Sequence, residues 1–213
     1  GDLGEFGSVS HWQWKRKKKP PLEYLMPRID KDVKVVNELF DKIDESLDKA
    51  KVKDRHAIQG NHDEWLDFFV EEHPYLPQYR YDKACSIKER GYKYHRASEY
   101  LKIGKLHYYH GHHYGGQYHT ANHLRKLGCS VMYGHLHGIQ MMSSTTLEGS
   151  LEAWCIGCLK NMASSKNKFL KGRPHNWQHA FAIVDYYKGG QFTVTLVRIV
   201  DGKATIFGEH IRG

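Results

Sequence analysis

The clearest pattern of hydrophobic and polar positions runs from Asp30 to Val52. Apolar residues recur there at spacings of three and four, with charged residues between them. Because an α-helix turns once in about 3.6 residues, this spacing gathers the apolar side chains on one face. We therefore predict an amphipathic helix over residues 30–52 that packs on a hydrophobic core.

Three short, partly apolar segments run directly into polar motifs. The segments with their motifs are 55–59 before Gly-Asn-His-Asp at 60–63, 105–109 before His110, and 129–133 before Gly-His-Leu-His at 134–137. We interpret each segment as a strand that ends at a candidate binding loop. In α/β folds, ligands collect beyond the carboxyl ends of the strands, so we predict an α/β fold with its site at these ends.

The remaining pattern predicts further helices and strands. We expect helices from about Trp65 to a point before Pro74, over 82–90, and over 117–127; Gly91 and Gly128 follow the last two and suit a left-handed helix end. Strands are predicted at 99–103, 139–142, 151–156, 179–186, 191–200 and 203–207. Glycine-containing turns at 188–190 and 201–202 indicate that the last three form a meander.

The length and composition indicate a single domain. A chain of 213 residues with 40% apolar content can bury a substantial core but is short for two domains. The sequence has no run of eighteen apolar residues and no charged-then-apolar leader at residue 1. We therefore expect no membrane span and a cytoplasmic location.

The charge of the chain suggests an anionic partner. The formal net charge is +8, and part of the excess lies in the basic run 15–19, which follows Trp12 and Trp14 and precedes two prolines. Such a loop can hold a phosphate backbone while its aromatic faces stack on bases, so DNA or RNA is a candidate partner. A solvated surface loop explains the same residues equally well.

The four cysteines are too few for a disulfide scaffold, so we expect reduced thiols. Cys155 and Cys158 have the spacing of a thioredoxin redox motif, but their flanks resemble a strand and a loop rather than a following helix. Together with His175 and His179 they also approach a zinc-finger pattern with an overlong middle gap. We keep both alternatives as minor ones.

Histidines concentrate in one stretch. Eight of the sixteen lie between His107 and His137; Gly111 separates His110 from His112, and Gly134 and Gly138 bracket His135 and His137. Imidazole is the commonest metal-binding side chain, and neighbouring glycines allow the backbone to approach an ion closely. A histidine-rich surface is the alternative for any single residue, but the clustering favours a metal site.

Taken together, the motifs resemble those of the calcineurin-like metallophosphoesterase family. The matching pieces are Gly1-Asp2, the Gly-Asn-His-Asp motif at 60–63, His110, and the Gly-His-Leu-His motif at 134–137, in the family's order and approximate spacing. The segments 154–159 and 177–184 are also similar to the C-terminal strands of phage-associated members.

The resemblance implies two mixed β-sheets packed as a sandwich and flanked by helices, with two divalent metal ions at the edge. The ions would be Mn²⁺, Fe²⁺, Ni²⁺ or Zn²⁺. Asp2 would bridge both of them. Asn61, His110 and His135 would complete the second site, and His137 would belong to the first.

One family element is missing. The family's Asp-x-His motif, at the end of the opening strand, should precede Gly1, and Asp54-Arg55-His56 is a poor substitute because it lies in the strand leading to Asn61. We therefore expect an N-terminally truncated domain that lacks its first strand. A one-metal or inactive relative is the alternative, since a site with two ligands binds metal weakly.

The expected activity is hydrolysis of a phosphate ester, a phosphodiester in preference to a monoester. Two ions can generate a metal-bridged hydroxide and neutralise the phosphoryl oxygens. His62 is the candidate general acid, with Asp63 holding its tautomer and orientation. His112, or alternatively His113, would contact a phosphate oxygen. The competing hypothesis is a catalytically incomplete nucleic-acid or partner-binding module with the same fold.

Overall fold

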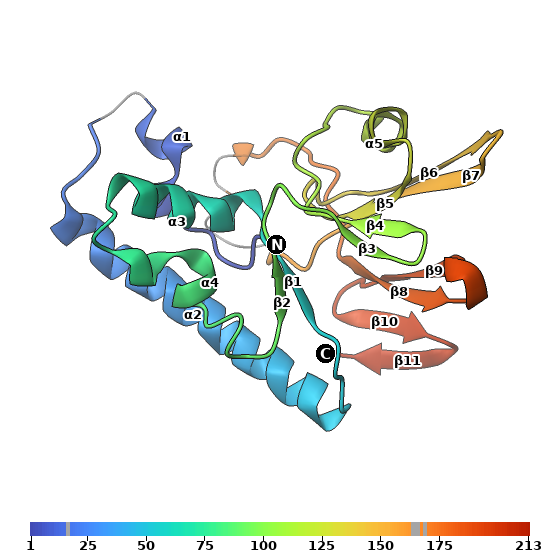
Figure 1. The fold of residues 1–213 in the computed structure, drawn as a ribbon, viewed down its shortest axis with the longest axis horizontal. Helices are drawn as coiled ribbons and strands as arrows, with labels where there is room; N and C mark the ends of the chain where they lie inside the picture. The colour runs from blue at the N-terminus through green and yellow to red at the C-terminus, as the bar shows by residue number, and fades with distance from the viewer. Residues whose placement is uncertain (16–17, 163–166, 168–169) are drawn as a thin grey trace. The chain divides into compact units, whose positions relative to one another are not determined.

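The computed structural model describes residues 1–15, 18–162, 167 and 170–213, and it has an α/β fold (Figure 1). The chain divides into two compact units, Gly1–Glu99 and Tyr100–Gly213. Within the described residues, no helix is both long and apolar enough to cross a membrane. The general α/β prediction is confirmed, whereas the two-sheet sandwich and the single domain stay predictions.

The first unit, Gly1–Glu99, is mainly helical. Its elements are η1 Gly7–Val9, α1 His11–Trp14, α2 Leu22–Lys49, β1 His56–Ile58, α3 Asn61–Glu72, η2 Pro77–Tyr79, α4 Tyr81–Ala84 and β2 Lys93–His95. The strands β1 and β2 pair in parallel, with His56 opposite Lys93. The predicted strand over 55–59 is confirmed as β1, but β2 was not predicted.

The helix α2 carries the core of this unit. Leu25, Ile29, Val36 and Phe40 are buried on one of its faces, as the spacing predicted. The helix begins at Leu22 rather than at Asp30, because Leu25 and Ile29 continue the apolar face toward the N-terminus. Pro27 lies inside this helix, where a proline removes one backbone hydrogen bond.

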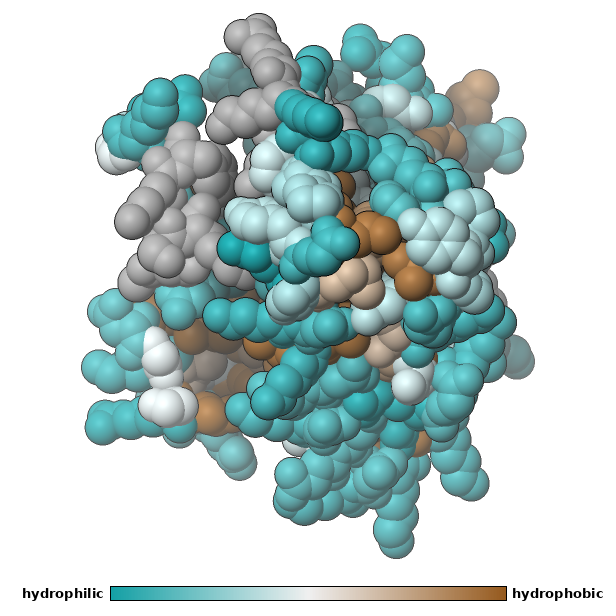
Figure 2. Space-filling view, turned by 90° about the vertical axis from the view of Figure 1, so that its left-hand side faces the viewer, coloured by the Kyte–Doolittle hydropathy of each residue, from teal (hydrophilic) through white to brown (hydrophobic). Residues whose placement is uncertain are grey.

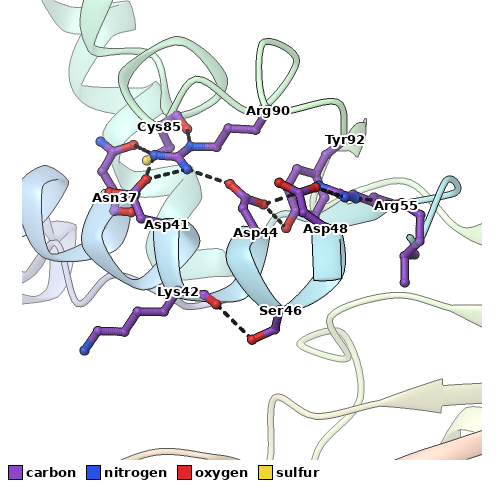
Figure 3. A network of polar contacts seen from close by, with 11 residues as sticks. Asn37, Asp41, Lys42, Asp44, Ser46, Asp48, Arg55, Cys85, Arg90 and Tyr92 are labelled. Carbon is purple, nitrogen blue, oxygen red and sulfur yellow. Dashed lines mark hydrogen bonds and ion pairs between the residues drawn. The ribbon is translucent and has the colours of Figure 1, made fainter. Parts of the chain in front are cut away.

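A polar network attaches the segment before β2 to the C-terminal half of α2 (Figure 3). The guanidinium of Arg90 lies 2.7 Å from carboxylate oxygens of both Asp41 and Asp44. The hydroxyl of Tyr92 donates to the second oxygen of Asp44 at 2.7 Å. Arg55, next to β1, pairs with Asp48. Charged pairs as well as the core thus hold the loops of this unit on α2.

The helix predicted over 82–90 is wrong in extent, because α4 ends at Ala84. Ser86 adopts a left-handed conformation with a φ of 50°. Its N–H donates to the carbonyl of Lys83, and the N–H of Ile87 donates to the carbonyl of Asp82. This pair of bonds closes a helix in the manner usually associated with glycine, so the serine gave no stop signal in the sequence.

The second unit, Tyr100–Gly213, is built on a mixed five-stranded sheet. Its elements are β3 Leu101–Ile103, β4 Leu106–Tyr108, α5 His119–Leu127, β5 Ser130–Tyr133, β6 Ile139–Thr146, β7 Gly149–Ile156, β8 Ala180–Tyr186, η4 Lys188–Gly190, β9 Phe192–Arg198, β10 Lys203–Ile206 and β11 Glu209–Arg212. The strand order is β3-β4-β5-β7-β6. Central β5 is parallel to both β4 and β7 and is buried along its length.

Most predicted strands of this unit are confirmed. β3 and β4 form the expected hairpin at Gly104, and β8 and β9 pair antiparallel. The predicted meander is only partly right, because β10 pairs with the unpredicted strand β11 in a separate hairpin and meets the end of β9 through a bridge between Val200 and Lys203. All of β11 is exposed, which explains why its sequence lacks an apolar pattern.

Candidate functional site

In the first unit, the predicted motif of residues 60–63 follows β1 and forms the start of α3. Gly60 lies directly before the helix, and Asn61 is its first residue. A Cβ added at Gly60 would stand 2.0 Å from a carboxylate oxygen of Asp2. Only glycine therefore allows the Asp2 side chain to lie against this turn.

The carboxylate of Asp2 caps the start of α3. Its Oδ1 accepts a hydrogen bond of 2.8 Å from the backbone N–H of His62. Asp2 itself adopts a left-handed backbone conformation with a φ of 59°, which aspartate tolerates better than most residues. The structure thus brings together Asp2 and the Asn61-His62 turn, as the sequence predicted for these residues.

Asp63 has a different role from the predicted one. It is fully buried, and its carboxylate accepts backbone hydrogen bonds from Gly60 and Asp2, both at 2.8 Å, and from Gly4 at 3.5 Å. Burial raises the pKa of Asp63 to about 7, with a further contribution from the charge of Asp2. Because both oxygens take backbone donors, this carboxylate fixes the turn, and the prediction that it orients the His62 ring is wrong.

The ring of His62 is positioned by an aromatic neighbour instead. It stacks on Trp65 with centroids 4.1 Å apart and an angle of 20° between the planes. Residues three apart lie on the same face of a helix, which explains this contact on α3. Trp65 is 8% exposed, so the imidazole stacks on a ring that is itself packed in the protein interior.

In the second unit, His110 and His135 meet at the carboxyl ends of the neighbouring parallel strands β4 and β5. Nε2 of His110 lies 2.9 Å from Nδ1 of His135. The carbonyl of His110 accepts hydrogen bonds from the backbone of Gly134 and of His135, at 3.3 and 3.0 Å. The two loops are thus fastened to each other, and the sequence prediction of a shared strand-end position for both histidines is confirmed.

His112 lies beside this pair. Its ring centroid is 5.8 Å from that of His110 and 6.2 Å from that of His135. The intervening Gly111 has a φ of 104°, and a Cβ there would lie 2.6 Å from the ring of Tyr133. The glycine allows the loop to turn tightly, so that the rings of His110 and His112 both lie near the ring of His135.

His137 follows in a tight turn and has a φ of 62°. Its backbone N–H donates to the carbonyl of Gly134, and its carbonyl accepts from Gln178. Its ring packs edge-on against Trp177 at 4.7 Å. The remaining candidate of this loop, His113, is exposed and contacts Tyr100 and Tyr109.

Two buried histidines of α5 were not predicted from the sequence. The predicted inward face of α5 contained Ala121, but His119 and His123 are buried there. Nδ1 of His119 lies 2.6 Å from the hydroxyl of Tyr133, and His123 stacks on the ring of Tyr133 at 3.9 Å. Burial lowers the pKa of both histidines. Their spacing of four residues on a helix was the available signal.

The two alternatives for Cys155 and Cys158 gain no support. Cys155 is buried in β7, and burial raises its pKa to about 11; burial also raises the pKa of Cys158. Both thiols are therefore poor nucleophiles at neutral pH. Nε2 of His179 lies against the carbonyl of Lys160, and His175 is exposed. The described residues of this segment form no cluster of three metal ligands.

Compared with protein-family models, with curated proteins and with solved structures, the chain has no match.

Proposed function

We propose that the chain is a metal-dependent phosphoesterase. The observation that carries the proposal is the pair His110 and His135, whose ring nitrogens lie 2.9 Å apart at adjacent strand ends. Two nitrogens bound to one ion at about 2.1 Å and at right angles to each other would be about 3.0 Å apart. The observed separation therefore suits neighbouring ligands of a single divalent ion.

The donor types support the same proposal. We assign Asp2 and Asn61 in the first unit, and His110, His135 and His137 in the second, as metal ligands. A carboxylate, an amide oxygen and imidazoles together suit Mn²⁺, Fe²⁺, Ni²⁺ or Zn²⁺. Two such ions would supply an activated water and neutralise charge on the phosphoryl oxygens.

The protein side chains supply the remaining chemistry. His62 is the proposed general acid that protonates the leaving oxygen, with its ring held by Trp65. His112 is the proposed contact for a phosphate oxygen. Asp63 supports both the acid and the ligand Asp2 indirectly, because it fixes the turn at Gly60.

Metal binding and hydrolysis test the proposal separately. Titration calorimetry with Mn²⁺ should show binding to the wild type that falls at least tenfold in His135→Ala, by the loss of a ligand. His210→Ala is the matched control, since this histidine is exposed on β11 of the same unit, and it should bind like the wild type.

Hydrolysis is then measured with a bis-aryl phosphodiester, an aryl phosphomonoester and an oligonucleotide in saturating Mn²⁺. The diester should be cleaved, and His62→Ala should lower its kcat by roughly 10²–10⁴-fold while metal affinity is kept. Cleavage of monoesters alone would refute the diesterase part of the proposal. If none of the three substrates is cleaved in saturating Mn²⁺, the phosphoesterase proposal fails as a whole, whether or not the ion is bound.

A further inference from the structure

A pocket of about 220 Å³ opens within the first unit, and none of its lining residues is a metal-ligand candidate. It is lined by residues of α1, of the loop before α2, of α2 and of α3. Figure 2 shows the corresponding side of the molecule, where hydrophobic side chains are exposed and framed by hydrophilic ones. The volume is below the roughly 300 Å³ at which sites for drug-sized ligands begin, so it suits one planar ring system.

Flat side chains dominate the walls of this pocket. The aromatic rings of Trp14, Trp65, Phe68 and Phe69 line it together with Pro20 and Pro21. Trp14 is held in place because its indole N–H donates to the carbonyl of Ser8 at 2.7 Å. Phe68 lines the pocket and is 45% exposed, so a ligand ring could cover it. Walls of this kind favour stacking on another aromatic ring.

The rim of the pocket is polar and offers both donors and acceptors. Lys19 and Glu72 form an ion pair there, and both side chains are about half exposed. Within the described part of the chain, the buried hydroxyl oxygen of Ser8 has no hydrogen-bond partner. A pure hydrocarbon ligand would leave these groups unused, whereas the edge of a nucleobase carries donors and acceptors of its own.

The surroundings of the pocket favour a ligand with phosphates. Lys15 lies over the ring of Trp12 at 4.9 Å, and Lys19 lines the pocket, with Lys18 next to it in the sequence. Lys19 is paired with Glu72, whereas the side chains of Lys15 and Lys18 are exposed. Alternation of lysines and aromatic rings is typical of sites for single-stranded nucleic acid.

We propose that this pocket binds one unstacked nucleobase of a single-stranded nucleic acid, with the phosphate backbone near Lys15 and Lys18. Trp65 connects the pocket to the candidate site, since it also stacks on His62. The inference deepens the proposed function by naming nucleic acid as the substrate class. Base binding itself needs neither metal nor hydrolysis.

The test compares two labelled probes in chelator, an oligothymidylate and an abasic oligonucleotide of equal length. The wild type should bind the oligothymidylate more tightly, because the abasic strand has the same phosphates but nothing to stack. Phe68→Ala should weaken oligothymidylate binding about tenfold and leave abasic binding unchanged. Phe68→Trp, which keeps an aromatic face, should restore the affinity.

Tyr24→Ala is the matched control, because Tyr24 is an aromatic residue of 41% exposure on α2 that does not line the pocket. It should bind both probes like the wild type. Equal binding of the two probes by the wild type, or unchanged binding in Phe68→Ala, would overturn the inference. Tighter binding of a proline-rich peptide, lost in Phe68→Ala, would also overturn it by assigning the pocket to a protein partner.

The two proposals fail in different ways. Base-dependent binding without turnover of any phosphate ester would refute the phosphoesterase and keep the nucleobase pocket. Turnover of bis-aryl diesters with no preference for bases over abasic sites would do the reverse.

Discussion

Replacement of Arg90 by methionine should destabilise the first unit by about 2–3 kcal/mol. The guanidinium contacts Asp44 at 2.7 Å, the side-chain oxygen of Asn37 at 3.1 Å and the carbonyl of Cys85 at 3.2 Å. Hydrogen bonds that involve a charged group contribute about 1.5–3 kcal/mol where they are shielded from water. The side chains of Arg90 and Asp44 are each 17% exposed, so their pair is shielded.

Other contributions are smaller and partly cancel. The side chain of Asp41 is 65% exposed, so its pair with Arg90 adds at most about 0.5 kcal/mol. The guanidinium also lies 5.6 Å from the ring centroid of Phe40, a contact worth about 0.5–1 kcal/mol. Methionine keeps the apolar stem and much of the packing, and Asp44 keeps its hydrogen bond from Tyr92.

Urea unfolding followed by tryptophan fluorescence and by circular dichroism measures this difference. Coincident transitions are required before a free energy of unfolding is assigned. Arg96→Met, at an exposed arginine nearby, should stay within about 0.5 kcal/mol of the wild type. A difference below about 0.5 kcal/mol for Arg90→Met as well would refute the reasoning, because desolvation of the charges would then cancel their attraction.

Two further predictions concern the candidate site and its support. Gly60→Ala should weaken Mn²⁺ binding measured by calorimetry about tenfold or more, because its Cβ would displace the Asp2 carboxylate; unchanged affinity would remove Asp2 from the proposed ligands. His119 and His123 should lower the free energy of unfolding as the pH drops below about 6.5, because burial lowers their folded-state pKa and the unfolded chain then binds more protons. The raised pKa of Asp63 acts in the opposite direction, so the test is the difference between the wild type and a double variant with glutamine at both histidine positions. Relative to this variant, the wild type should lose stability in urea unfolding between about pH 7.5 and 5.

Periodic residues were predictable from the sequence, and long-range partners were not. The apolar spacing of α2 and the glycine after α5 are local signals, and both helices are present, although α2 begins at Leu22 rather than at Asp30. β2 is three residues long, and its identity depends on pairing with β1 across a separation of more than thirty residues. Neither its composition nor its length carries that information.

The candidate site divides in the same way. Motif order was enough to select His110 and His135, because each follows a short apolar strand. The role of Asp63 was misassigned because sequence proximity to His62 suggested a side-chain contact, whereas the first turn of a helix directs an acidic side chain to backbone N–H groups. The stacking of His62 on Trp65 follows from helical spacing once Asn61 is recognised as a helix start.

The bonds of Asp63 affect how genetic data on this chain should be interpreted. One buried carboxylate holds the backbone of Gly60, the backbone of Asp2 and the entrance of α3 at once. In an activity screen, substitutions at Asp63 would therefore score as severely as substitutions of a residue that touches the substrate. Purified Asp63 variants would nevertheless lose thermal stability and metal affinity together, because the backbone of Gly60 and Asp2 would shift. A defect confined to the His62 ring would leave both properties intact.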